Sequence, residues 1–423
     1  MKENIVIIGA GASGLFAAIK ASEKNYDITV LEANEKAGKK ILMTGNGRCN
    51  LTNMIMSSKF YYTKDLNFVE NVINKFNQKD TIREFNKFGV TIKDKNNYIY
   101  PNSMQASTVL SALLSICNLR GIKIETDNFV NEIKQCEDGS FIINARDTKA
   151  NSDLQYKASK LLIACGTKAC VKEDYLSGIN DFIKATSHRM YRQLPALCSI
   201  YAKKDKTLKP FFKNTSGVRS EINCSLYFDN NYITESGGEL QITDYGFSGI
   251  VIFQISRFIS RVNNDFPNAN KVLYIDFLPS YDTARLLEIF KSELYYEKKS
   301  LQDLFDGIIN SKLSHELLML YSAKVDGNIK PFNKNIPLEK LQEIIEFLKN
   351  TPFIIDKTNS ANFSQVCTGG VCTNDIYENM ESKLVKNLYF SGECIDVDGM
   401  CGGYNLQWAW STGYIAGRSM TND

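Results

Sequence analysis

The first 32 residues contain the feature that most constrains the fold: a strand, a glycine-rich turn, a helix and a second strand, in that order. Ile5–Ile8 is a short run of β-branched residues, Gly9–Gly14 reads GAGASG, and Leu15–Lys24 has a helical pattern. The second apolar run, Ile28–Leu31, leads directly into Glu32. A GxGxxG motif alone also occurs in ordinary glycine-rich turns, but this order of elements predicts a dinucleotide-binding βαβ unit.

Each glycine of the motif has its own physical role in such a unit. Gly9 permits the tight turn after the strand, Gly11 lets the backbone approach a pyrophosphate, and Gly14 lets the helix pack close to the strand. The helix N-terminus offers free N–H groups and a positive dipole end to the phosphates. Glu32, 23 residues after Gly9, is placed to accept hydrogen bonds from a ribose diol. A glutamate here suits both FAD and NAD, so the motif leaves the dinucleotide open.

Two later segments favour FAD. Gly38–Asn50, which includes Lys40, is a glycine-rich basic loop at a place where a plain NAD domain would continue into another βα unit. Asn387–Glu393 is expected to be a strand ending in Gly-Glu, and Gly402–Gln407 opens a final helix that runs to about Arg418. The N-terminus of that helix would favour the negative charge that develops on a reduced flavin. The alternative is a terminal βα unit that only completes the sheet.

Length and charge limit the class of protein. A chain of 423 residues suggests about three structural units of roughly 150 residues each. The 50 Lys and Arg against 47 Asp and Glu leave a net charge of only +3, whereas nucleic-acid-binding proteins usually carry a larger or more clustered basic excess. No apolar run reaches the ~18 residues of a membrane span, and the N-terminus does not resemble a signal peptide. We expect a cytoplasmic protein without a nucleic-acid or membrane partner.

The cysteines and histidines argue against a metal site and for cofactor chemistry. Eleven cysteines in a cytoplasmic chain are expected to be free thiols, and none forms a Cys-x-x-Cys pair. The only histidines are His188 and His315. We therefore expect no metal site, and neither a histidine-based hydrolytic triad nor a facial iron triad.

The middle of the chain divides by its patterns. Short strands are expected at Ile122–Glu125, Phe129–Ile133, Phe141–Asn144 and Leu161–Ala164, and helices within 60–90 and at Ser107–Leu119. From Gln193 the pattern changes to short β segments separated by turns such as Gly237-Gly238. Arg285–Leu348 is mostly helical, and the chain then returns through Phe353–Ile355.

Several segments together resemble a known family. They are Gly9–Gly14, Gly38–Asn53, Tyr98–Ala106, Gly238–Ser256, Thr368–Val371 and Met380–Gly417. Met380–Gly417, with the sequence MESKLVKNLYFSGECIDVDGMCGGYNLQWAWSTGYIAG, is the most specific of them. The chain is similar over nearly its full length to the bacterial BaiN-type flavoproteins, also called the aminoacetone oxidase family, which are distant relatives of fumarate reductase flavoproteins. The match is weakest between about Tyr281 and Phe353.

The resemblance implies an α/β fold with a Rossmann-like FAD-binding domain built from both chain ends, a β-rich domain and a small helical domain. The boundaries that we expect are 1–192 and 367–423 for the FAD domain, 193–280 and 350–366 for the β-rich substrate domain, and 281–349 for the helical insert. The residues that the motifs and the resemblance assign to FAD are Gly9, Gly11, Ser13, Gly14, Glu32, Lys40, Gly45, Arg48, Cys49, Asn50, Val130, Ala164, Gly166, Gly392, Glu393, Asp396, Gly403, Tyr404, Asn405 and Leu406.

The chain departs from the family near the expected substrate cavity. Relatives often have His and Pro where Asp244 and Ile250 stand, and a Thr-Gly-Gly with a Gly-Ser-rich turn where this chain has Cys165–Cys170 and then Lys172-Glu173-Asp174. The substrate therefore cannot be carried over from the family.

The function indicated is an FAD-dependent oxidoreductase that exchanges a hydride between flavin N5 and a small organic substrate. Reduction of an activated C=C bond is favoured over oxidation of a primary amine by oxygen, because fumarate reductase kinship supplies a mechanism. A remoter alternative is a flavin-containing RNA-modification protein, as some relatives of this Rossmann class act on tRNA. Because the chain has no second GxGxxG, any NAD(P)H would bind only transiently at the flavin.

Candidate catalytic residues are Arg48, to polarise a substrate carbonyl, and Tyr404 or Arg189, to relay a proton. Arg48 could instead pair with a carboxylate, and Tyr404 could simply pack. His188 is more simply read as a surface or hydrogen-bonded histidine than as a catalytic residue. Cys367 and Cys372 stand with four residues between them, so they could form a redox pair if their α-carbons lay within about 7 Å; the simpler reading is free thiols used as small apolar packers.

Overall fold

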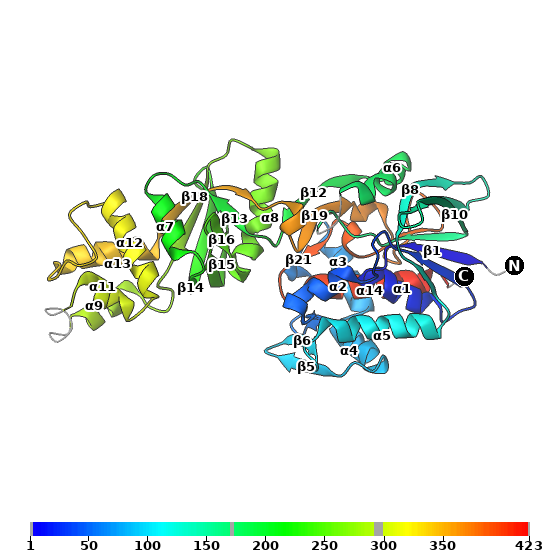
Figure 1. The fold of residues 1–423 in the computed structure, drawn as a ribbon, viewed down its shortest axis with the longest axis horizontal. Helices are drawn as coiled ribbons and strands as arrows, with labels where there is room; N and C mark the ends of the chain where they lie inside the picture. The colour runs from blue at the N-terminus through cyan, green and yellow to red at the C-terminus, as the bar shows by residue number, and fades with distance from the viewer. Residues whose placement is uncertain (1–2, 170–172, 292–298, 422–423) are drawn as a thin grey trace. The chain divides into compact units, whose positions relative to one another are not determined.

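The computed structural model describes residues 3–169, 173–291 and 299–421. Their contacts divide the chain into two compact units (Figure 1). Unit 1 comprises Met1–Leu194 and Ala361–Asp423, and unit 2 comprises Pro195–Ser360. The expectation that one domain is built from both chain ends is confirmed. Lys172 and Cys170 of the departure noted above lie outside the described residues.

The core of unit 1 is a five-stranded parallel sheet with the strand order β20-β11-β1-β2-β7. The strands are β1 (Asn4–Ile8), β2 (Asp27–Leu31), β7 (Lys123–Glu125), β11 (Lys160–Ile163) and β20 (Leu388–Phe390). Four of them are short, mostly apolar runs because parallel sheets are covered on both faces, whereas β7 is a Lys-Ile-Glu edge strand with exposed charges. Strand β1 lies in the middle between β11 and β2, and β20 and β7 are the edge strands. The expected α/β class is confirmed.

Two helices from opposite ends of the chain pack backbone to backbone in unit 1. They are α1 (Ala12–Ala21) and α14 (Tyr404–Ser419), which lie side by side in Figure 1. A Cβ atom at Gly413 would lie 2.5 Å from the carbonyl oxygen of Ser13, and one at Gly417 would overlap that of Ala17. Only glycine lets two helices approach this closely.

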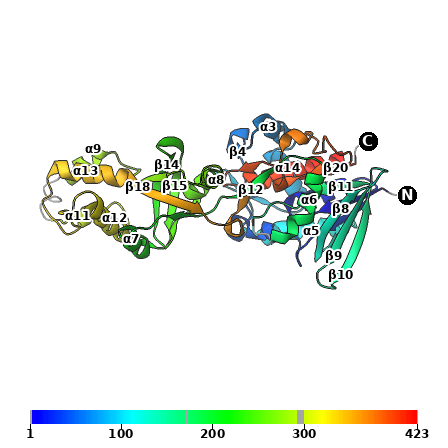
Figure 2. The same ribbon diagram turned by 90° about the horizontal axis from the view of Figure 1, so that it is seen from above.

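Smaller elements surround this core. A three-stranded antiparallel sheet comprises β8 (Asn128–Gln135), β9 (Phe141–Asp147) and β10 (Ser152–Ala158) (Figure 2). A second one comprises β3 (Thr52–Asn53), β5 (Ile92–Lys95) and β6 (Tyr98–Pro101). The remaining elements that matter for the site are α2 (Lys39–Met43), α3 (Leu66–Lys75), α4 (Gln78–Lys87), α5 (Ala106–Leu119), α6 (Ser177–Ala185), β4 (Tyr61–Tyr62), β12 (Met190–Ala196), β19 (Val366–Val371) and β21 (Asp398–Gly399).

Unit 2 is a closed barrel with helices. The strand order is β13 (Ile200–Ala202), β16 (Gly246–Ser248), β15 (Asn231–Ile242), β14 (Arg219–Phe228), β17 (Lys271–Asp276) and β18 (Thr351–Thr358). The helices are α7 (Leu208–Thr215), α8 (Ile250–Asp265), α9 (Thr283–Phe290), α11 (Leu301–Asp306), α12 (Ser311–Lys324) and α13 (Leu338–Lys349). One hydrophobic core joins the barrel with these helices. The boundaries expected for a separate helical insert stay a prediction.

Three local expectations were wrong. The segment Gly38–Asn50 is not all loop, because α2 forms between its glycines. Gly237-Gly238 is not a turn but lies inside β15, where Gly237 pairs with Asn223 and a Cβ would lie 2.6 Å from the Asn223 side chain. The β-rich region also contains α7 and α8. The β-branched residues of α8 resemble a strand, but Val251, Ile255 and Ile259 recur at helical spacing and are buried.

Among the described residues, no helix is both long and apolar enough to cross a bilayer.

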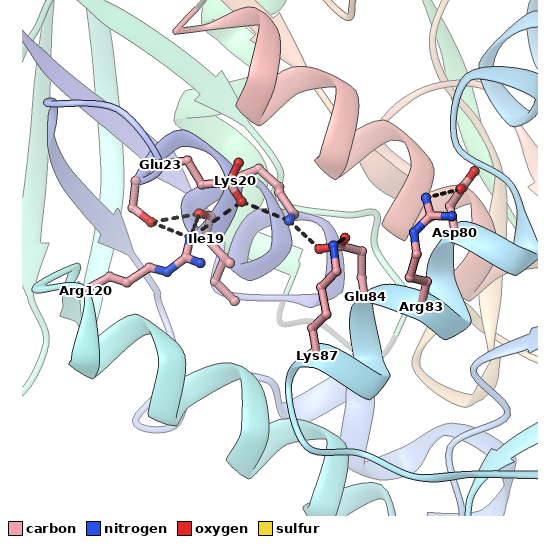
Figure 3. A network of polar contacts seen from close by, with 9 residues as sticks. Ile19, Lys20, Glu23, Asp80, Arg83, Glu84, Lys87 and Arg120 are labelled. Atoms are coloured by element: carbon pink, nitrogen blue, oxygen red, sulfur yellow. Dashed lines mark hydrogen bonds and ion pairs between the residues drawn. The ribbon is translucent and has the colours of Figure 1, made fainter.

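A buried ion pair fixes α1 against α4 (Figure 3). Lys20 and Glu84 are each 5% exposed, and the Lys20 ammonium contacts the Glu84 carboxylate. Glu84 also pairs with Lys87 at 2.8 Å, and Lys20 with Glu23 at 3.0 Å. Burial alone would raise the pKa of Glu84, but the hydrogen bonds from Lys20 and Lys87 outweigh it and hold that pKa below its usual value.

Replacement of Gly417 by Val should destabilise unit 1 by about 3 kcal/mol or more, because the branched side chain would collide with the backbone of α1. The matched control is Arg418→Val, which puts the same side chain on the exposed neighbouring position of the helix and should cost less than about 1 kcal/mol. Urea denaturation measures both. Equal losses in the two variants would show that the close helix contact is not needed.

Replacement of Glu84 by Gln should cost about 3 kcal/mol, because it leaves the buried Lys20 charge undercompensated. The control Arg83→Gln removes an exposed ion pair of the same helix and should cost less than about 1 kcal/mol. Because the folded pKa of Glu84 is depressed, its contribution is present above the unfolded pKa of about 4.3 and is lost as pH falls through the folded value. Denaturation at pH 7 and pH 3 should therefore show a smaller difference between wild type and Glu84→Gln at pH 3.

Candidate active site

The glycine-rich turn between β1 and α1 is held by contacts that exclude side chains. Gly9 has φ +109°, and a Cβ there would overlap the carbonyl oxygen of Ala164 at the end of β11. A Cβ at Gly14 would overlap the carbonyl oxygen of Gly9. The amide of Gly9 donates to the carbonyl of Leu31 at 2.7 Å. Gly9, Gly14 and Ala164 therefore shape the turn.

Gly11 differs from these glycines because a Cβ there would meet no atom within 4 Å. It caps α1 without a side-chain hydrogen bond, so the first N–H groups of the helix lie next to open space. Ser13 lies beside Gly392, where a Cβ would overlap the Ser13 hydroxyl, and that hydroxyl donates to the carbonyl of Ser391 at 3.5 Å. The start of α1 and the end of β20 therefore meet at one place.

Glu32 follows β2 and turns its carboxylate toward the glycine-rich turn. One oxygen accepts from the amide of Ala10 at 3.0 Å, and the other accepts from the backbone and side chain of Asn34 at 2.9 and 2.6 Å. A carboxylate has about four acceptor positions, so one remains for a ligand hydroxyl. The Glu32 carbonyl accepts from the amide of Asn128, two residues before the buried Val130 of β8.

The segment after α2 contains a buried polar atom without a partner. The side-chain oxygen of Asn50 has no hydrogen-bond partner among the described residues, although Asn50 is only 9% exposed. Leaving such an oxygen unpaired costs about 1–3 kcal/mol. The backbone that leads to Asn50 has positive φ angles at Gly45 and Cys49. A Cβ at Gly45 would lie 3.2 Å from the Asn50 amide nitrogen.

Cys49 and Arg48 differ in exposure. Cys49 is fully buried, and burial raises the pKa of its thiol to about 12. Arg48 is exposed, and its positive charge lowers the pKa of Tyr100, against the larger effect of burial that raises it. The phenol of Tyr100 and the Arg48 guanidinium therefore lie near each other.

Glu393 connects four segments of unit 1. Its carboxylate pairs with the Lys40 ammonium of α2, accepts from the Thr167 hydroxyl after β11, and accepts from the amide of Cys367 in β19 at 3.2 Å. Gly166, beside Thr167, has φ +72° and open space where a Cβ would be. The structure thus brings Lys40, Gly166 and Glu393 together, and their role in binding a cofactor stays a prediction. Thr167 was missed, because nothing in the sequence near it indicates a partner 226 residues away.

The start of α14 is built on left-handed glycines. Gly403 has φ +97°, and a Cβ there would lie 2.7 Å from the carbonyl oxygen of Thr52. The Asn405 side chain accepts from the amide of Gly399 at 2.8 Å and donates to its carbonyl at 2.9 Å. Asp396 accepts from the amide of Gly369 at 3.1 Å, and Leu406 is half-buried.

The two proposed proton relays make structural contacts. The Tyr404 phenol donates to the carbonyl of Ile55 at 3.0 Å and stacks on Phe60 with ring centres 4.9 Å apart. Burial is the main cause that raises the pKa of Tyr404 to about 12. The Arg189 guanidinium binds both carboxylate oxygens of Asp375, at 2.7 Å from its terminal nitrogen and 3.3 Å from Nε. Asp375 was missed by the sequence analysis.

His188 and the cysteines follow the simpler interpretations. His188 is buried with both ring nitrogens hydrogen-bonded, to Thr186 at 2.8 Å and Ser382 at 2.7 Å. Cys367 and Cys372 are buried free thiols in the structure, and burial raises the pKa of Cys367 to about 12. A redox role for the pair stays a hypothesis.

The arrangement fits a dinucleotide cofactor. Open space lies beside Gly11 at the start of α1, Glu32 retains an acceptor position, and the buried oxygen of Asn50 lacks a donor. These three features lie at the ends of β1, β2 and α2 in the same unit. In parallel α/β sheets, ligands bind beyond the carboxyl ends of the strands.

Comparison with known proteins shows the family. The family described as HI0933-like protein Rossmann domain matches residues 3–419. The chain therefore belongs to the HI0933-like family, and the expected kinship with BaiN-type proteins is confirmed.

Two curated relatives cover nearly the whole chain. A 3-dehydro-bile acid delta(4,6)-reductase from Clostridium scindens is 36% identical over an alignment that covers 98% of this chain and 98% of the relative. A ribosomal RNA dihydrouridine synthase from Haemophilus influenzae is 26% identical over an alignment that covers 99% of this chain and 98% of the relative. Among solved structures, 3-ketosteroid delta1-dehydrogenase from Sterolibacterium denitrificans has a TM-score of 0.52 at 11% identity, covering 99% of this chain and 100% of the other. This last likeness concerns the fold alone.

Replacement of Gly11 by Val should weaken flavin binding at least about 100-fold, or ~2.7 kcal/mol, because the side chain would occupy the open space beside the first turn of α1. The apoprotein should still fold, since no protein atom lies within 4 Å of the new Cβ. Flavin absorbance of the purified protein and fluorescence titration of the apoprotein measure the binding. The control Gly327→Val places the same side chain in an exposed segment of unit 2. Full flavin content in Gly11→Val would contradict the site.

Proposed function

We propose that the protein is an FAD-dependent reductase of an activated C=C bond in an organic substrate. The observation that carries the proposal is the 36% identity, over nearly both full chains, to a reductase that acts on a 3-dehydro-bile acid. The site supports it, because the turn at Gly11, the carboxylate of Glu32 and the unpaired oxygen of Asn50 fit an adenine dinucleotide with a further ring system. When bound, the flavin would supply a hydride from N5.

The residues of unit 1 would hold and tune this cofactor. The N–H groups at the start of α1 bind the pyrophosphate, and Glu32 binds the ribose of the adenosine. The Asn50 oxygen accepts a hydrogen bond from a cofactor N–H or O–H group, which removes the cost of its burial. The positive end of α14 stabilises negative charge on the reduced ring. Arg48, exposed beside Tyr100, polarises the substrate carbonyl.

Oxidation of a primary amine by oxygen is the alternative from the same family. It is less favoured because Asp244 and Ile250 stand where relatives of that activity often have His and Pro. In unit 2, Asp244 is exposed and its carbonyl accepts from Lys204 at 2.9 Å, and Ile250 is the first residue of α8 with 58% exposure.

An RNA substrate is a second candidate because two relatives at 26% identity, from Haemophilus influenzae and Escherichia coli, are ribosomal RNA dihydrouridine synthases. A small organic substrate is preferred, since the identity to the bile acid reductase is higher and the net charge is only +3. We also propose that NAD(P)H binds transiently at the flavin. A cytoplasmic location is part of the same proposal and is in keeping with the free thiols.

The decisive experiment is anaerobic stopped-flow spectroscopy of the photoreduced enzyme. Rapid reoxidation of the flavin by a cyclic enone, with slow reoxidation by oxygen, is expected. Flavin reduction by a primary amine together with fast reaction with oxygen would favour the oxidase and contradict the reductase. Reoxidation by ribosomal RNA but by no enone, with binding that weakens steeply as salt increases, would favour the RNA candidate.

A further inference from the structure

A reductase of this class needs an acid beside the flavin, and the two relays expected from the sequence are engaged elsewhere. The Tyr404 hydroxyl donates to the carbonyl of Ile55, and the Tyr404 ring is only 6% exposed. The Arg189 guanidinium donates to both carboxylate oxygens of Asp375 through Nε and one terminal nitrogen. The Tyr404 phenol cannot give a proton to a substrate without breaking its contact, and the hydrogen bonds to Asp375 raise the pKa of Arg189 and make it a weaker acid.

Tyr98 stands at the same end of unit 1 and has no such engagement. It is the first residue of β6, pairs with Asn53 of β3, and is 40% exposed. No described residue hydrogen-bonds its hydroxyl. An exposed phenol can exchange its proton with solvent, which a catalytic acid must do in every turnover.

The backbone before α14 is shaped to receive the Tyr98 ring. Gly402 has φ +116°, and a Cβ there would lie 2.8 Å from Cε1 of Tyr98. The side-chain amide of Asn53 donates to the carbonyl of Gly402 at 3.0 Å, which ties β3 to the same turn. Tyr98 therefore packs on the residue that precedes the left-handed Gly403 at the start of α14, where the proposed flavin edge is held.

The groups around Tyr98 suit acid catalysis on a polarised carbonyl compound. Tyr100 follows on the same face of β6, two residues along. Burial is the largest cause that raises the pKa of Tyr100, and Tyr98 raises this pKa further. The positive charge of Arg48 lowers it. Tyr98 also lies near Tyr404, whose pKa it raises in addition to burial. The phenol of Tyr98, the guanidinium of Arg48 and the start of α14 therefore lie in one region of unit 1.

We propose that Tyr98 is the catalytic acid of the reaction, a role that rests on the proposed function. The hydride of the reduced flavin forms a C–H bond at the β-carbon of the enone, and the π electrons of the C=C bond move to the α-carbon and carbonyl oxygen. The phenol O–H of Tyr98 breaks, its proton forms the new bond at the α-carbon, and the phenolate takes a proton from solvent. The flavin is oxidised and the C=C bond is reduced.

The test is Tyr98→Phe, which removes only the hydroxyl and keeps the ring on Gly402. Reoxidation of the photoreduced variant by the enone should be slower by about 10²–10³-fold. FAD affinity from fluorescence titration, the melting temperature, and enone binding seen as a spectral change of the oxidised flavin should stay at wild-type values. The matched control is Tyr377→Phe, which removes the hydroxyl of another exposed tyrosine of unit 1, outside this cluster, and should react at close to the wild-type rate.

The outcomes separate the two proposals. Wild-type rates in Tyr98→Phe, or a loss confined to Tyr404→Phe, would overturn the role of Tyr98 while leaving the reductase intact. The catalytic role of Tyr98 would also be overturned if Tyr98→Phe bound FAD or the enone more weakly and this weaker binding accounted for the slower rate. Tyr98 would then act only by packing. If no enone reoxidises the wild-type flavin, the proposed function fails, and the role of Tyr98 fails with it.

Discussion

The close contact between α1 and α14 is the constraint on which the rest of unit 1 depends. Ser13 meets Gly413 and Ala17 meets Gly417, so the two helices run in the same direction with their backbones touching. Since α14 begins at Tyr404, it extends about two and a half turns beyond the contact at Gly413. Both positive helix ends therefore point to the same side of the sheet. A dinucleotide, which carries its charge on the pyrophosphate and on the reduced ring, matches two such ends.

The polar groups of the site fall into two kinds, and the difference has a physical meaning. Glu393 is already satisfied by Lys40, Thr167 and the amide of Cys367, so it fixes the ends of α2, β11 and β19 before any ligand binds. Asn50 is buried with an unpaired oxygen, which costs free energy until a donor arrives. The first arrangement preorganises the site, and the second is stabilised only by a ligand.

The sequence predicted the parts that depend on local chemistry. The positions of Gly9 and Gly14 follow from a turn whose neighbours leave no room for a Cβ, and the parallel strands follow from short apolar runs. The contacts of Glu393 with Thr167 and of Arg189 with Asp375 join segments 226 and 186 residues apart, for which local patterns carry no signal. Helix α8 was missed because its β-branched residues favour a strand, and its helical spacing shows only when the whole segment is considered.

The thiols near the site help to define what kind of chemistry its own residues can perform. Burial raises the pKa of Cys49, Cys165 and Cys367 to about 12, and raises that of Cys394 well above its usual value. A thiol attacks or transfers electrons as the thiolate, and a raised pKa lowers the fraction of thiolate near neutral pH. The four cysteines instead fill small apolar spaces around the ends of the parallel strands. The exposed side chains that the proposal uses at this site are Arg48 and Tyr98.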